Sequence, residues 1–123
     1  MITLANKTAA LAATVLLAMS GIANADTMDE EIDHLLNTVG SSGCVFIRNG
    51  KRYEAPAAQK HLQTKRKRGK RYYKNADEFI ANLASESSMS GDPYFIQCGD
   101  EAQQLSGDWF AAVLAKYREP GAD

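Results

Sequence analysis

The chain has few of the residues that build most small catalytic and metal sites. Its 123 residues include only two histidines, His34 and His61, and only two cysteines, Cys44 and Cys98. Two histidines are too few for a histidine-rich metal site, and the cysteine spacing matches neither a CxxC redox motif nor a zinc ribbon. The sequence contains no Ser-x-x-Lys, Gly-x-Ser-x-Gly or His-Glu-x-x-His motif. We therefore expect no metal, no cofactor and no catalytic residue, and the sequence favours a protein that is not an enzyme.

The chain also lacks an excess of either charge, but its charges are strongly segregated. Lysine and arginine number 14 against 15 acids, giving a net charge of −1. Residues 26–33 carry five acids and no base, whereas residues 48–74 carry eleven bases against Glu54 alone, and acids dominate again from residue 77 onward. With 45% hydrophobic and 24% charged residues, the chain has the composition of one globular domain.

Long apolar runs are missing except near the N-terminus. Residues 8–23 form an apolar run after the single charge of Lys7, and Ala23-Asn24-Ala25 matches the small-x-small pattern of a cleavage site. The run is short and alanine-rich for a transmembrane anchor, and acidic residues follow it. The sequence thus predicts a signal peptide over residues 1–25, cleaved after Ala25. A single exported domain over 26–123, with no transmembrane segment in the mature protein, would remain.

Two cysteines in an exported chain favour a disulfide. Cys44 and Cys98 would close a loop of 55 residues, which the chain-entropy model values at about 4 kcal/mol. In a reducing cytosol the same residues would be buried thiols.

Turn signals and hydrophobic periodicity predict four helices and three strands in the order αββααβα, an α+β fold with a small antiparallel sheet. Asn49-Gly50, between strands over 44–48 and 51–54, suits a two-residue type I′ hairpin turn. A disulfide would tie the first strand to the third and make the first strand central. The remaining elements are expected as a helix up to Gly40, helices over 57–68 and 76–84, a strand over 94–98 and a last helix near the C-terminus.

Capping patterns predict where three of the helices begin. Thr27 and Asn75 each precede a glutamate by three residues, as in a capping box. Ser106 is expected to cap the last helix, with Leu105 and Phe110 placed as a hydrophobic staple.

Several segments together resemble a known family. They are Cys44-Val-Phe-Ile-Arg-Asn-Gly50, His61-Leu-Gln-Thr-Lys65, Phe79-Ile80 and Ser85-Glu-Ser-Ser-Met-Ser-Gly-Asp-Pro-Tyr94. With them the chain resembles the YfeK-like family of small exported proteins of Gram-negative bacteria, over nearly all of its mature length. The resemblance implies a periplasmic location and paired cysteines. It implies no activity, substrate or catalytic residue.

His61 and Lys65 form the most specific candidate ligand site. Four residues apart on one helix, they project from the same face as Leu62, which should point inward. The functional interpretation is a small anion or carboxylate site in which a ligand bridges the two side chains, with Arg48, Ser88 and Ser90 nearby. The alternative is a lysine that reaches solvent along the apolar surface beside a hydrogen-bonded structural histidine. The serines between 85 and 90 have a similar alternative, in which they satisfy helix-end carbonyls and shape a turn.

The basic segment over residues 60–74 is the strongest signal for a partner. Its charge density and interleaved tyrosines suit an anionic partner, and the expected contact surface consists of Arg66, Lys67, Arg68, Lys70, Arg71 and Lys74. The alternatives are a merely solvated surface, or pairing with the acidic segments of the same fold. In a periplasmic protein we expect an anionic envelope component or an acidic protein, and no nucleic acid. The leading hypothesis is a non-enzymatic binding module, and the alternative is a small enzyme or ligand binder around His61 and Lys65.

Overall fold

The computed structural model describes residues 24–121, with side chains from Thr27 onward. The predicted signal peptide therefore lies outside the described residues, apart from Asn24 and Ala25. In the described part the helices are α2 (Asn24–Ser41), α3 (Ala55–Arg68), α4 (Ala76–Phe79) and α5 (Ser106–Tyr117), with a 3-10 turn at Lys70–Tyr72 and a π-helix η3 at Ile80–Ala84. The strands are β1 (Val45–Arg48), β2 (Lys51–Tyr53), β3 (Phe95–Gln97) and β4 (Gln104–Leu105).

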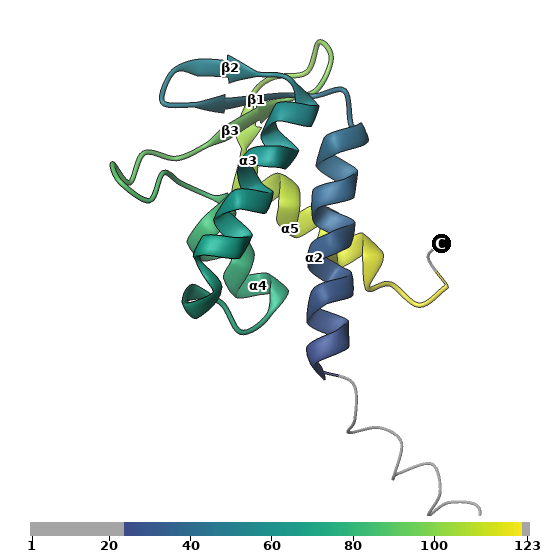
Figure 1. Ribbon diagram of the computed structural model, residues 1–123. Coiled ribbons are helices and arrows are strands. Elements are labelled where there is room, and N and C mark those ends of the chain that lie inside the picture. Colours follow the sequence, from purple (N-terminus) through teal and green to yellow (C-terminus); the bar gives the residue numbers. More distant parts are fainter. Residues whose placement is uncertain (1–23, 122–123) are drawn as a thin grey trace, which may run out of the picture.

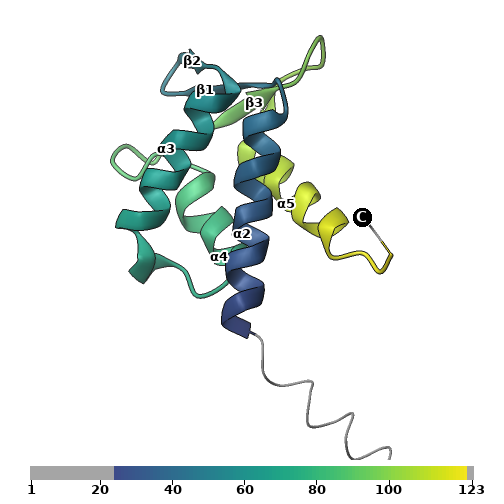
Figure 2. The ribbon, with the colours of Figure 1, turned by 45° about the vertical axis from the view of Figure 1, so that its right-hand side comes forward.

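The α+β class is confirmed, with four antiparallel strands where three were expected. The strand order is β2-β1-β3-β4, so β1 is central, as predicted. Figure 1 shows the sheet at one end of the molecule with the helices below it, and α2 beside both α3 and α5. The turned view in Figure 2 keeps this arrangement. β4 has no signature in the sequence, because it is two residues long and both residues are exposed, so no hydrophobic alternation marks it.

The hairpin and the disulfide form as expected. Asn49 and Gly50 have φ angles of 52° and 79°, the left-handed conformation that a type I′ turn requires. Cys44, just before β1, and Cys98, just after β3, form a disulfide with a Cα–Cα distance of 4.3 Å. Because β1 pairs with β3, the bond joins the ends of two adjacent strands.

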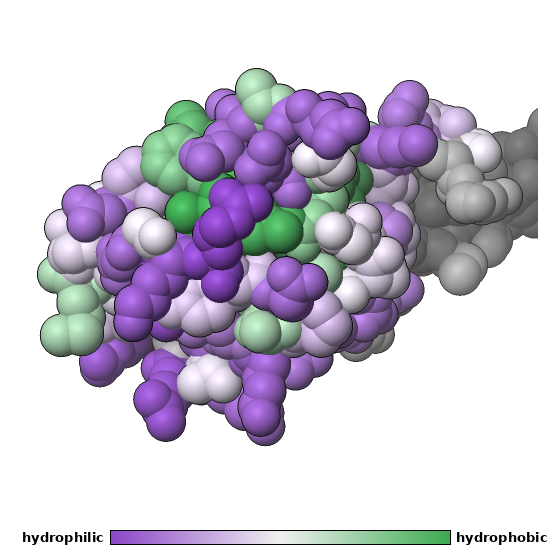
Figure 3. Space-filling model, turned by 90° about the horizontal axis from the view of Figure 1, so that it is seen from above, coloured by the Kyte–Doolittle hydropathy of each residue, from purple (hydrophilic) through white to green (hydrophobic). Residues whose placement is uncertain are grey.

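The core lies between the sheet and the helices. Phe46 and Ile96 from the sheet are buried together with Leu62 of α3 and Phe110 of α5. Leu62 is fully buried, which fixes the orientation of its helical neighbours His61 and Lys65. Viewed from above, the surface is mainly hydrophilic around a small hydrophobic area (Figure 3).

The capping predictions were right at one helix and wrong at two. Asn75 accepts a hydrogen bond from the Glu78 amide at 2.8 Å, as a capping residue should. Thr27 does not cap α2, because α2 already begins at Asn24 and no glycine or proline interrupts it there. Ser106 is the first residue of α5 and its fully buried hydroxyl donates to the Ala84 carbonyl at 2.6 Å. Leu105 takes the N-cap position and is 43% exposed, so tertiary contact replaces the expected local cap.

Candidate functional site

The structure brings the predicted ligand residues to one cavity of about 610 Å³. The hairpin turn and the serine loop (residues 85–92) extend on the same side of α3 (Figures 1 and 2). Between these three elements the cavity is lined by all five predicted residues, Arg48, His61, Lys65, Ser88 and Ser90. Residues that lie far apart in the sequence thus meet because β1, α3 and the segment before β3 converge here.

The side chain at the centre of the site is Tyr94, which the sequence analysis placed in a strand without a role. Its hydroxyl lies 3.0 Å from the ammonium of Lys65 and 3.3 Å from Nε2 of His61. A protein hydroxyl therefore occupies the position between these two side chains where we expected a bound anion. The sequence did contain a signal for this role, because Tyr94 stands at the start of a predicted core strand. A tyrosine buried there needs a hydrogen-bond partner for its hydroxyl.

Lys65 is half-buried and has one ammonium proton to spare. It donates to the Glu86 carbonyl at 3.1 Å and to Tyr94, and an ammonium carries three donors. Burial and, to a smaller extent, the charge of Arg48 lower the pKa of Lys65 to about 8, while the Glu86 carboxylate acts in the opposite direction. The cation is therefore incompletely compensated, which favours an additional negative partner.

Arg48 and His61 form the side of the cavity next to the hairpin. Nη1 of Arg48 lies 3.4 Å from both ring nitrogens of His61. The guanidinium therefore lies against the imidazole ring and is not directed at one nitrogen. Nη2 donates to the Tyr53 hydroxyl at 3.2 Å, which holds the side chain in place. Burial, with smaller contributions from Arg48 and Lys65, lowers the pKa of His61 to about 4. His61 is consequently neutral at pH 7, and the positive charge of the site comes from Arg48 and Lys65.

The serine loop is an ordered hairpin-like segment. Glu86 and Pro93 form an isolated antiparallel bridge, and the Gly91 amide donates to the Ser87 carbonyl at 2.9 Å. Gly91 has a φ of 76°, which a side chain would strain. Ser90 lies 3.4 Å from the Asn49 amide oxygen, linking the loop to the hairpin turn. Ser85 fits the structural interpretation, because its hydroxyl donates to the Ile80 carbonyl at 2.6 Å. Ser87 and Ser90 also shape the turn, since their hydroxyls accept from the Ser90 and Asp92 amides at 3.4 and 3.3 Å.

Comparison with known proteins places the chain in a family. Residues 26–118 match the model of the family of unknown function DUF5329. The chain belongs to this family. It is also similar to the uncharacterized protein YfeK of Salmonella typhimurium, with 32% identity over 82 residues that cover 65% of this chain and 68% of that protein. The resemblance inferred from the sequence segments is thus confirmed. No solved structure matches the chain.

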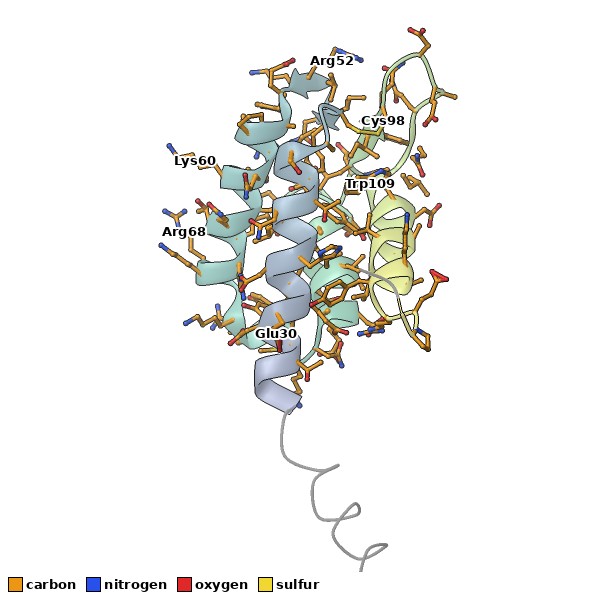
Figure 4. The ribbon with its side chains drawn as sticks, turned by 90° about the vertical axis from the view of Figure 1, so that its right-hand side faces the viewer. Glu30, Arg52, Lys60, Arg68, Cys98 and Trp109 are labelled. Atoms are coloured by element: carbon orange, nitrogen blue, oxygen red, sulfur yellow. A yellow bond between two sulfur atoms is a disulfide. The ribbon has the colours of Figure 1, made fainter. Side chains whose placement is uncertain are left out.

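The basic surface divides into one paired residue and five unpaired ones. Nη1 of Arg66 lies 2.6 Å from Asp33 and Nη2 lies 3.3 Å from Asp29, so this arginine joins α3 to the acidic face of α2. The other five are exposed and form no ion pair with any side chain in the described range: Lys67, Arg68, Lys70, Arg71 and Lys74. Arg68 also lines the cavity, and Figure 4 shows it extending outward from α3, as Lys60 does.

A larger cavity of about 930 Å³ lies between α2 and α3, but its charges are mixed. Its lining includes Lys60, Lys67 and Lys70 together with Asp29 and Asp33. In contrast, no acidic side chain of residues 27–121 lines the cavity around Lys65. The lining of that cavity therefore carries charge of one sign only, whereas the lining of the larger cavity carries both signs.

Two further findings concern the described range alone. No helix between residues 24 and 121 is long and apolar enough to cross a membrane. Within the same range, no three His, Cys, Asp or Glu side chains are grouped as a metal site would require.

Proposed function

We propose that this protein is a non-enzymatic binding module that takes an anionic ligand in the cavity between α3, the hairpin turn and the serine loop. One observation carries the proposal: Arg48, Lys65 and Arg68 line the cavity, and no acidic side chain among the described residues does. Ser88 and Ser90 of the serine loop also line the cavity and carry hydroxyl groups. Cations and hydroxyls converging on one cavity suit recognition of a carboxylate or phosphate group.

The arrangement of the central groups favours binding over catalysis. A general base needs a free lone pair within reach of a substrate proton, and a nucleophile needs a base beside it. Nε2 of His61 instead lies 3.3 Å from the Tyr94 hydroxyl, and that hydroxyl also accepts from Lys65. The small-enzyme alternative would require this contact to break before His61 could act on a substrate.

The exposed basic surface extends the same function. Lys67, Lys70, Arg71 and Lys74 continue from Arg68 along and beyond the end of α3, with no acidic partner in the described part of the chain. The positive electrostatic potential of these side chains attracts anions and raises the rate at which they meet the protein. An anionic envelope component or an acidic protein would contact this surface while one anionic group enters the cavity.

We place this activity in the periplasm. The proposal is supported by the N-terminal pattern ending at Ala25, by the family match that begins at residue 26, and by the disulfide, which suits an oxidising compartment.

A titration with inorganic phosphate tests the proposal. We expect amide and side-chain NMR signals around Lys65, Arg48 and Ser88 to shift saturably, and the binding to weaken at high salt. Lys65→Met should abolish the effect with little loss of thermal stability, because methionine keeps most of the apolar stem of the side chain and the Tyr94 hydroxyl keeps its contact with His61. The control is Lys116→Met, which removes an exposed lysine from α5 and should bind phosphate like the native protein. Equal binding by both variants, or no saturable shift near Lys65, would overturn the proposal.

A further inference from the structure

The cavity around Lys65 has apolar as well as cationic lining. Its apolar lining residues are Leu83 of the π-helix, Tyr72 after α3 and Met89 of the serine loop. Its polar lining includes Arg48, Lys65 and Tyr94, whose hydroxyl accepts from Lys65. A ligand that contacts both kinds of lining must carry a charged group and an apolar body.

Two residues of the apolar lining, Met89 and Tyr72, are unusually exposed for large hydrophobic side chains. Met89 is 98% exposed at the tip of the serine loop and Tyr72 is 52% exposed after α3. They make up half of the four large hydrophobic side chains that the described residues expose, and both line this one cavity. Apolar side chains gathered beside a polar site mark a contact surface, and methionine adapts its shape to different apolar partners.

The backbone keeps the floor of the cavity apolar and open. Gly69 ends α3 and lines the cavity, and a Cβ atom there would lie 2.9 Å from Cδ1 of Leu83. Glycine thus allows the end of α3 to approach Leu83 closely without placing a side chain over it. The φ angle of Gly69 is −107°, which other residues can adopt. Glycine is therefore required here by the close approach to Leu83 and not by the backbone conformation.

The number of cations indicates which charged group fits. Arg48, Lys65 and Arg68 together offer three positive charges, and the Glu86 carboxylate acts on Lys65 from outside the lining. A phosphomonoester carries between about 1.5 and 2 negative charges at neutral pH, with three acceptor oxygens. It compensates more of this charge than a carboxylate does, and it can accept from the free proton of Lys65 and from Arg48 together.

We infer that the ligand of this site is an amphiphilic phosphomonoester, with its phosphate at Arg48 and Lys65 and its apolar body along Leu83, Tyr72 and Met89. The inference rests on the proposed function and specifies the ligand class. The same chemistry occurs in the phosphate headgroup of a single-phosphate lipid and in a small phosphorylated metabolite with an apolar substituent.

The test compares four soluble probes by calorimetry on the disulfide-bonded protein: inorganic phosphate, hexyl phosphate, hexanoate and hexanol. Each buried methylene adds about fourfold in affinity, so we expect hexyl phosphate to bind at least about tenfold more tightly than inorganic phosphate. It should also bind more tightly than hexanoate, and hexanol should not bind. Equal affinity for hexyl phosphate and inorganic phosphate would overturn the inference while leaving the proposed function intact. Hexanoate binding as tightly as hexyl phosphate would overturn the phosphate assignment, and failure of every anion would overturn the proposed function as well.

A substitution in the apolar lining tests its contribution separately from that of the cations. Met89→Ser should remove most of the affinity gained by the hexyl chain, so that the ratio between hexyl phosphate and inorganic phosphate falls several-fold. The matched control is Leu105→Ser, which removes another exposed apolar side chain that does not line this cavity, and it should keep the native ratio. An unchanged ratio in Met89→Ser would overturn the placement of the apolar body.

Vesicles identify the source of the ligand. Binding to phosphatidic acid vesicles, but not to phosphatidylcholine vesicles, with loss of binding in Lys65→Met, would support the inference with a lipid as the source. Binding of soluble hexyl phosphate without vesicle capture would support it with a small metabolite as the source.

Discussion

Arg66 of α3 forms an ion pair with Asp33 of α2, with Nη1 2.6 Å from the carboxylate oxygen. The pair joins the basic segment of the sequence to the acidic segment. Asp29 adds a second contact at 3.3 Å, and Arg66 is 21% exposed whereas the two carboxylates are more than half exposed. Of the six residues of the basic surface, Arg66 is therefore paired within the fold, and the other five are exposed to solvent. Pairing within the fold thus describes Arg66, and an exposed contact surface describes the other five residues.

This division predicts different effects for adjacent substitutions. Arg66→Gln should lower the free energy of unfolding by about 0.5–1 kcal/mol, because exposed ion pairs contribute at most about 1 kcal/mol each. Lys67→Gln should change it by less than about 0.5 kcal/mol. Urea unfolding measures the free energy of unfolding of both variants and of the native protein. Equal losses would mean that the Arg66 pairs contribute nothing to stability.

Removal of the disulfide should destabilise the domain strongly. The bond spans a sequence separation of 54 residues, and loss of a native disulfide from a small secreted domain typically costs about 2–5 kcal/mol. We expect Cys44→Ser combined with Cys98→Ser to lower the midpoint of thermal unfolding accordingly. Intact mass before and after alkylation without reductant provides the control, since the native protein should take up no label.

The Ser106 hydroxyl should contribute more to stability than its exposed counterpart in α2. Ser106 is fully buried and donates to the Ala84 carbonyl at 2.6 Å, while the exposed Ser41 hydroxyl donates to the Asn37 carbonyl at 2.9 Å. Ser106→Ala leaves a buried acceptor without its partner, which costs about 1–3 kcal/mol. In Ser41→Ala water replaces the donor, so we expect almost no loss. Chemical unfolding would contradict the prediction if the two variants lost equal stability.

His61 should make stability depend on pH between about 4 and 6.5. Its pKa is lowered from 6.5 to about 4 in the folded protein, so in this window the unfolded chain binds more protons than the folded one. Stability should therefore fall as the pH decreases from 6.5 towards 4. The groups that face the ring are Arg48, Lys65 and Tyr94.

Replacement of the histidine tests that assignment. His61→Gln should flatten the stability profile in this window, and an NMR titration of the imidazole in the native protein should give its pKa directly. The control is His34→Gln on the far side of α2, where His34 stacks on Tyr117 with ring centroids 4.2 Å apart. If His34→Gln flattened the profile and His61→Gln did not, the assignment would be wrong.

The family assignment, the α+β class, the hairpin and the cysteine pair could all be inferred from the sequence. Each depends on local or compositional signals, such as the Asn49-Gly50 turn or an even pair of cysteines in the chain. Helix α4 likewise begins where the sequence places it, because Asn75 accepts a hydrogen bond from a residue only three positions away. At Asn75 the local preference agrees with the fold, whereas at Ser106 a contact with Ala84 replaces the expected local cap.

The candidate site could be predicted only in part. The i, i+4 spacing puts His61 and Lys65 on one face, and burial of Leu62 turns that face towards the protein. Which residue meets them is a matter of how β3 and the serine loop pack against α3. Tyr94 is 29 residues from Lys65 in the sequence, and no pattern along the chain links the two.

The sequence by itself thus determined the four helices and three of the four strands, the cysteine pair and the placement of charge along the chain. The tertiary structure decided which charges are neutralised and which remain available. Arg66 meets the acids of α2 and becomes part of the fold, whereas Lys65, one residue earlier, turns into a cavity without an acidic lining. The physical reason is that adjacent residues on a helix point about 100° apart, so their environments are set by two different packed neighbours.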